Sequence, residues 1–177
     1  MTTSYPTFEP VVFCESAEIR ARLDRLPEAQ DALFVSGLPK EFFYHDYHAD
    51  DALALVQTDR GRLIRFASSG LADAIGIDPR TGEVVYVVNV RGAPTGFVNS
   101  SLPQFTRTVK EVIERFPYYA ADAPDDEIES ASNSLQSIIR SIDPPALVPG
   151  RFWSTFIADV EIGDLSTEDV LAADDGE

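Results

Sequence analysis

The chain has 177 residues, 44% of them hydrophobic and 25% charged, which is the composition of an ordinary globular protein. Folding at this length buries roughly 70% of the surface that the unfolded chain exposes, so one domain can form a core without metals or disulfides. Fourteen basic and thirty acidic residues give a net charge of −16, which excludes electrostatic attraction to nucleic acid or to an anionic membrane.

Cysteine content and the amino-terminal sequence indicate a compartment. Cys14 is the single cysteine, which excludes an intrachain disulfide and suits a reducing environment. The sequence MTTSYPTFEP lacks the basic region and apolar run of a secretory signal peptide. No stretch approaches the ~20 apolar residues that span a bilayer. We therefore expect a cytoplasmic protein.

The first predicted elements are a helix and a run of strands. Residues 17–26 place Ile19, Leu23 and Leu26 on one helical face, with Ser16 as the candidate cap. The last predicted strand is rich in β-branched residues, and we expect it to be central and covered on both faces. Short connections favour an antiparallel meander. The predicted strands are 53–57, 62–67, 74–78 and 83–90.

The clearest helix signal follows these strands. Ser101 and Gln104 fit a capping box, and Pro103 lies in the first turn, where no N–H donor is needed. Apolar residues then recur at helical spacing as far as Phe116, and Pro117 ends the helix.

The rest of the chain is predicted to contain two more ordered elements and a tail. A helix is predicted at 127–142, and residues 151–162 fit either a helix, which we prefer, or a strand. Residues 163–177 are polar and acidic, so we expect a disordered tail after one domain of residues 1–162. Strands followed by helices predict an α+β fold with a central antiparallel sheet flanked by helices.

Two histidines are the only candidates for a metal site. His45 and His48 lie close to Asp46, Asp50 and Asp51. No known ligand pattern specifies a further ligand, and we interpret the segment as a polar turn after an aromatic run. We predict no metal.

Motifs for covalent catalysis or phosphate binding are lacking in the sequence. It contains no G-x-S-x-G element and no glycine-rich phosphate loop. Asn99, Ser100 and Ser101 open a predicted helix, where a nucleophile or an anion could sit, but capping explains them more simply. We therefore predict no catalytic residue and no cofactor.

The acidic excess is concentrated in the last third of the chain. Residues 1–121 carry 12 basic and 16 acidic side chains, whereas residues 122–177 carry 2 basic and 14 acidic ones. Such a field attracts a basic protein, although it also serves solubility alone. Tyr118 and Tyr119 adjoin the acidic loop 120–127, where they are either core residues or exposed interface anchors.

Three passages of the chain follow one another in a distinctive order. Leu38–Pro39 and Phe42–Phe43 precede strands of the type QTDRGRLIRFASSG, and a hairpin follows around IDPRTGEVVYV. The most specific passage is GFVNSSLPQFTRTVKEVIERF, a strand that runs into Asn–Ser–Ser and a helix. These passages resemble the SUKH superfamily, and within it the fourth group of SUKH immunity proteins of bacterial toxin systems. Phe152–Trp153 agrees with an aromatic residue of the family's final helical region. The resemblance covers residues 30–160, and the extra helix and the acidic tail depart from it.

The resemblance implies an α+β fold without catalytic residues and a cytoplasmic protein that binds a cognate toxin, often a nuclease or a nucleic-acid deaminase. Asn99, Ser100, Ser101 and Trp153 match positions of the family pattern, and we interpret them as residues that maintain the fold.

We therefore predict an immunity protein that neutralises a basic protein toxin by covering its active surface, with no nucleic-acid or membrane partner. One alternative is a general interaction or scaffold module of the same fold. Another is an enzyme or metal protein that uses His45 and His48. The residues predicted to contact the toxin are Tyr118, Tyr119, Asp122, Asp125, Asp126 and Glu127.

Overall fold

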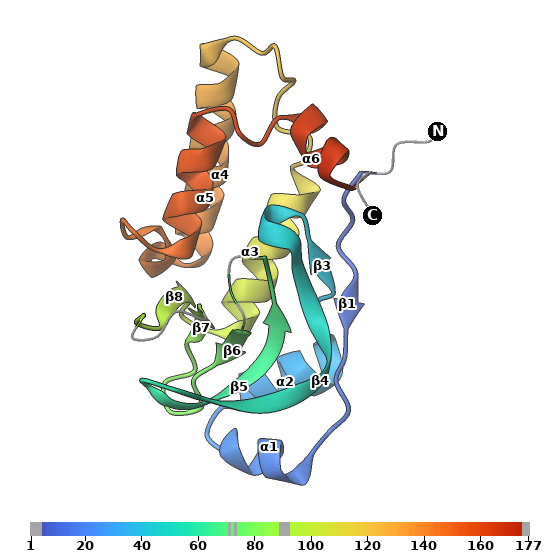
Figure 1. The fold of residues 1–177 in the computed structure, drawn as a ribbon, viewed down its shortest axis with the longest axis vertical. Coiled ribbons are helices and arrows are strands. Elements are labelled where there is room, and N and C mark those ends of the chain that lie inside the picture. The colour runs from blue at the N-terminus through green and yellow to red at the C-terminus, as the bar shows by residue number, and fades with distance from the viewer. Residues whose placement is uncertain (1–4, 71, 73, 89–92, 175–177) are drawn as a thin grey trace.

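A curled antiparallel sheet of six strands forms the centre of the fold (Figure 1). The computed structural model describes residues 5–70, 72, 74–88 and 93–174. The strand order follows the chain, so the predicted meander and the α+β class are confirmed. The strands of this sheet are β3 (Glu41–Phe42), β4 (Tyr47–Thr58), β5 (Gly61–Ser68), β6 (Ala74–Ile77), β7 (Val84–Val87) and β8 (Gly96–Asn99).

The sequence before β3 forms a small two-stranded sheet and short helices, which share one hydrophobic core with the main sheet. Strand β1 (Pro10–Val11) pairs with β2 (Leu38–Pro39) in a separate two-stranded sheet. Helices α1 (Ala17–Arg22) and α2 (Pro27–Asp31) and a π-helical turn (Ala32–Ser36) lie between these two strands in the chain. Helix α1 ends four residues earlier than predicted. Ser16 stands at its cap position, but its side chain donates or accepts no capping hydrogen bond.

Two strands differ from their predicted extent or position. β4 begins at Tyr47, six residues before the predicted strand, because its first residues pair with β3. β7 lies next to the edge strand β8, and its residues Tyr86 and Val87 are only half-buried. The prediction of a central strand covered on both faces was therefore wrong for this half of β7. Residues 89 and 90 of that predicted strand lie outside the described residues.

Helix α3 (Leu102–Glu114) packs on the sheet and carries much of the core. The Ser101 hydroxyl accepts a hydrogen bond from the Gln104 N–H at 3.3 Å, so the predicted cap residue is confirmed. The reciprocal bond of the predicted capping box is not formed, because the Gln104 side chain contacts the Ser101 hydroxyl and the Ile142 carbonyl instead. The ring of Phe105 lies between those of Tyr47 and Phe66, with 5.8 Å between centroids in both pairs. The remaining buried residues of this helix include Leu102, Val109, Val112 and Ile113.

Two long helices lie side by side beyond one end of the sheet (Figure 1). Helix α4 (Asp125–Ile142) begins two residues earlier than predicted, and the short turn η3 (Pro144–Leu147) connects it to α5 (Phe152–Glu161). The segment 151–162 is thus a helix, the preferred of the two predictions. Its buried face consists of Phe152, Trp153, Phe156, Ile157 and Val160. Among the described helices, none combines the length and the apolar character that a membrane crossing needs.

The segment expected to be a disordered tail contains a helix instead, α6 (Thr167–Asp174). Its start is fixed to Tyr119, whose carbonyl accepts hydrogen bonds from the Thr167 N–H and hydroxyl at 2.8 and 2.9 Å. Val170 is buried, and the Glu168 carboxylate accepts from the Ala121 N–H at 2.8 Å. Polar composition predicted disorder, but these contacts with a distant segment of the chain order residues 163–174. Residues 175–177 lie outside the described residues.

Candidate partner-binding surface

The amino-terminal end of α4 presents the densest acidic sequence of the fold. Asp125, Asp126 and Glu127 form its first turn, and all three side chains are exposed. Carboxylates are favourable there because the helix dipole is positive at its amino terminus. Asp122 is exposed in the loop before the helix. The four carboxylates that the sequence predicted as contacts therefore lie on the surface around one helix end.

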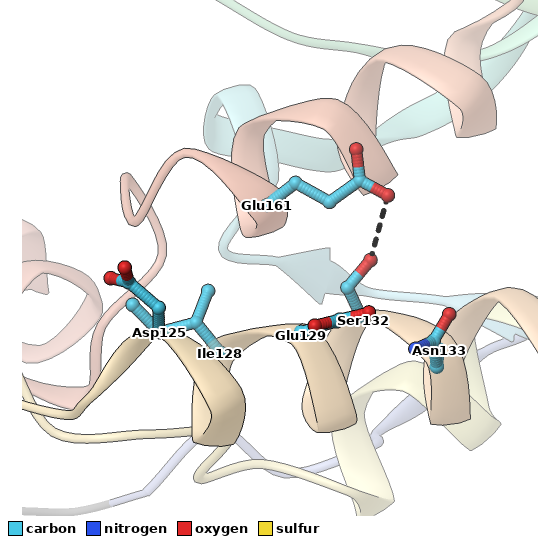
Figure 2. Close-up of a pocket in the computed structure, with 6 residues that line it drawn as sticks. All are labelled: Asp125, Ile128, Glu129, Ser132, Asn133 and Glu161. Atoms are coloured by element: carbon cyan, nitrogen blue, oxygen red, sulfur yellow. Dashed lines mark hydrogen bonds between the residues drawn. The ribbon is translucent and has the colours of Figure 1, made fainter.

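A groove runs along the seam between α4 and α5. Its first hollow has a volume of about 400 Å³. Figure 2 shows Glu161 extending from α5 towards Ser132 on α4, whose hydroxyl donates a hydrogen bond to the Glu161 carboxylate at 3.1 Å. The hollow is lined by Asp125, Ile128, Glu129, Ser132, Asn133 and Glu161.

A second hollow of about 410 Å³ continues the groove towards the α4–α5 connection, and Glu161 lines both hollows. Its lining includes the η3 residue Leu147, the connection residues Pro149 and Gly150, and the α5 residue Ile157. None of the described residues that line the two hollows is Lys, Arg or His. The charged side chains that line the groove are therefore all acidic, namely Asp125, Glu129 and Glu161.

Exposed apolar side chains adjoin the groove. Ile162 directly follows Glu161 and is 71% exposed, and Val148 stands between two lining residues and is 45% exposed. Single exposed apolar residues are common on protein surfaces. Here they are neighbours in the chain of residues that line the groove, which gives a protein partner apolar contact area near the acidic lining. The face made by the groove, Ile162 and Val148 is called the α4–α5 face below.

The two tyrosines that the sequence offered as interface anchors point into the protein. Tyr119 is 3% exposed, and its hydroxyl donates to the Val160 carbonyl at 2.9 Å. Tyr118 is half-buried against Phe116, and its hydroxyl donates to the Val112 carbonyl at 2.8 Å. Burial raises the pKa of both phenols. Tyr119 is thus unavailable as an interface anchor. The sequence left open whether this tyrosine is a core residue or an exposed anchor, and the structure shows a core residue.

A buried polar cluster joins the Asn99–Ser100 segment to the end of α4. The Asp143 carboxylate is fully buried and accepts hydrogen bonds from the Asn99 amide at 2.9 Å and from the Ser100 N–H and hydroxyl, both at 2.7 Å. Asn99 in turn accepts from the indole N–H of Trp153 at 2.8 Å. These hydrogen bonds connect the end of β8 to the end of α4 and to α5. They support the interpretation that Asn99, Ser100 and Trp153 maintain the fold.

The two histidines do not converge. His45 is half-buried with its ring against Tyr44, and burial lowers its pKa. His48 lies on β4, where its ring nitrogens contact the Ser68 hydroxyl at 3.0 Å and the Asp46 carbonyl at 3.1 Å. The structure shows no group of three His, Cys, Asp or Glu side chains suited to a metal within the residues that it describes. His48 and Ser68 form a serine–histidine contact, but neither of them lines the two hollows.

Sequence reasoning predicted Asp125 but missed four other residues of these sites, namely Glu129, Ser132, Glu161 and Asp143. Asp125, Glu129 and Ser132 follow one another at helical spacing, so the α4 side of the groove was readable from the sequence. Glu161 comes from another helix, 29 residues from Ser132, and no local pattern predicts that meeting. Asp143 follows the last turn of α4, where the helix dipole disfavours a negative charge, and that conflict was a usable signal for a buried partner.

Comparison with known proteins gives a family. Neither a curated protein nor a solved structure matches the chain. The model of the SUKH-4 immunity proteins matches residues 15–159, which include the sheet, α3, α4 and most of α5. Since the match extends over most of its length, this chain belongs to the SUKH-4 immunity protein family.

Proposed function

We propose that this protein is a toxin-specific immunity protein that binds its cognate toxin directly and covers the toxin's active surface. The observation that carries the proposal is the membership in the SUKH-4 immunity protein family. Function then requires a surface for a protein partner, and the α4–α5 face supplies hollows, carboxylates and exposed apolar side chains together. No chemical step is needed from the immunity protein, because an occluded toxin cannot reach its substrate.

The charge of the α4–α5 face indicates the chemistry of the toxin. A field made by Asp125, Glu129 and Glu161 attracts a surface rich in Lys and Arg, and such surfaces are typical of proteins that bind nucleic acid. We therefore propose a toxin of the nuclease or nucleic-acid deaminase class. Carboxylates would occupy positions that substrate phosphates otherwise take, so binding and inhibition would involve the same basic residues. Both proteins would meet in the cytoplasm.

The test needs a candidate toxin domain, to be sought among the genes adjacent to that of this protein. Association is measured by stopped flow at low and moderate salt, and protection is measured as growth of cells that express both proteins. The variant Asp125→Asn/Glu129→Gln removes two charges from the groove, and we expect association about tenfold slower at low salt. The matched control Asp24→Asn/Glu28→Gln removes the same charges from exposed residues of the α1–α2 region, and we expect it to bind normally.

Two results separate the parts of this proposal. Normal binding by the groove variant would place the interface on another face while leaving toxin immunity intact. Absence of any binding or protection with the unaltered protein would overturn the immunity function itself. The scaffold-module alternative would then be the better interpretation of the fold.

A further inference from the structure

The outer edge of β4 is unpaired over most of its length. β4 extends to Thr58, but β3 pairs only with its first two residues, Tyr47 and His48. Among the described residues, no strand other than β5 pairs with positions 50–58, and no loop backbone donates to them. In Figure 1, β4 runs along the margin of the sheet. A free edge of N–H and C=O groups is a template for another strand.

Only the second half of this edge has regular strand geometry. The register with β5 shifts between Ala49 and Ala54, so the intervening residues bulge. Arg65 fixes this bulge by donating two hydrogen bonds to the Asp50 carboxylate, at 2.7 and 2.9 Å. Bulges protect edge strands against pairing, and here the protection covers the first half alone. From Ala54 to Thr58 each residue has a regular partner on β5.

The hairpin turn determines which backbone groups of this segment face outward. Thr58 and Gly61 are paired and flank the two-residue turn Asp59–Arg60. In such a hairpin the flanking pair exchanges both backbone hydrogen bonds, and the pattern then alternates along the strand. The backbone groups of Leu55 and Gln57 therefore point away from β5.

The charge distribution selects the partner of this edge. The segment Ala54–Thr58 is uncharged. The surrounding hairpin, residues 50–65, carries three acidic and three basic side chains and is therefore neutral, although the whole chain has a net charge of −16. This neutral edge does not attract a basic partner electrostatically. If a second copy of the chain pairs through the same edge, the paired residues carry no charges that repel each other. Identical strands can pair antiparallel about a two-fold axis.

We infer that this protein forms a two-fold dimer in which the Ala54–Thr58 edges of two copies pair antiparallel, centred on Val56. Leu55 of each copy then lies opposite Gln57 of the other, so the outward N–H and C=O groups of both residues bond across the interface. Val56 meets its counterpart at the axis. The dimer joins two six-stranded sheets into one. It does not depend on the proposed toxin-binding function, which uses α4 and α5.

Sedimentation equilibrium of the full chain, over a range of protein concentrations and at low and high salt, tests this inference. We expect a monomer–dimer equilibrium that tightens as salt increases, because salt screens the repulsion between two copies of charge −16. Val56→Glu places like charges directly opposite each other and should raise the dimer dissociation constant about fivefold or more. Val12→Glu adds the same charge at a residue that is 50% exposed elsewhere, and we expect a far smaller effect.

A second variant removes a donor instead of adding a charge. Gln57→Pro removes one outward N–H group and retains the bonds to β5, since proline is tolerated on edge strands. We expect it to weaken the dimer, while Gln57→Ala leaves the dimer intact. Thermal melts show whether Val56→Glu and Gln57→Pro are folded. If one of them is not, the dimer dissociation constant of the other tests the inference. A chain that stays monomeric under all conditions, or a dimer unaffected by the folded variants, overturns the inference.

Discussion

The buried carboxylate of Asp143 provides the sharpest test of how the SUKH-4 fold is held together here. It accepts three hydrogen bonds, from the Asn99 amide and from the Ser100 N–H and hydroxyl, and none of these donors is charged. In Asp143→Ala all three donors lose their acceptor, at about 1–3 kcal/mol for each donor that stays dry. Water that enters the space can accept from some of these donors and so reduce the penalty. We therefore expect a loss of about 3–5 kcal/mol in the free energy of unfolding.

The matched variant Asp143→Asn keeps the shape of the side chain. Its carbonyl oxygen can take the position that accepts from the Asn99 amide and the Ser100 N–H. Its NH₂ group can then donate to the Ser100 hydroxyl oxygen, because a hydroxyl group both donates and accepts. Only the extra strength of hydrogen bonds to a charged group is lost, and we expect a cost of about 1–2 kcal/mol.

Urea unfolding followed by tryptophan fluorescence measures both variants. Trp153 is the single tryptophan, is fully buried and donates to Asn99, so its emission reports on this region. For a domain of this size, the loss in Asp143→Ala corresponds to a fall in melting temperature of about 10 °C. An Ala variant within about 1 kcal/mol of the original chain would refute the reasoning. So would an Asn variant as unstable as the Ala variant.

Two further predictions concern α6 and pH. Tyr119→Phe removes a hydroxyl that donates to the Val160 carbonyl and accepts from the Leu165 N–H at 3.2 Å. Amide exchange in α6 should become about tenfold faster, whereas Tyr5→Phe, at an exposed site, should leave it unchanged. Burial lowers the pKa of His45 below its unfolded value, so the folded state binds fewer protons there. The free energy of unfolding should therefore fall as pH decreases through and below the ordinary histidine range. His45→Asn should reduce this dependence on pH, and asparagine tolerates the positive φ of 55° at this position. An unchanged dependence on pH would contradict the assignment to His45.

Local sequence signals were enough for the elements whose stability is local. Helix α3 was predicted with its cap because Ser101, Gln104 and the apolar spacing all lie within one segment of the chain. The meander was predicted because turn residues separate short β-branched runs, and consecutive strands pair. The fold class and the family resemblance depended on the same signals.

Elements stabilised by distant residues were not predictable in this way. Helix α6 is polar enough to suggest disorder, but Tyr119, 48 residues before Thr167, accepts the hydrogen bonds that fix its start. Asp143 was missed for a similar reason, because its partner Asn99 lies 44 residues away in the sequence. Charge density correctly placed Asp122 and Asp125 on the surface, but it could not show that Tyr119 turns inward to bond with α5.

The two proposed interfaces have opposite dependences on salt, and this difference makes each a control for the other. The α4–α5 face acts through Asp125, Glu129 and Glu161, so salt should slow its association with a basic toxin. The neutral β4 edge must overcome repulsion between two acidic copies, so salt should strengthen its pairing. The groove is made by α4 and α5 and the pairing edge by β4, so Asp125→Asn/Glu129→Gln should leave the dimer intact and Gln57→Pro should leave toxin binding intact. If either variant changed both equilibria, the two surfaces would be one interface, and a dimer through β4 would have to be part of how the toxin is bound.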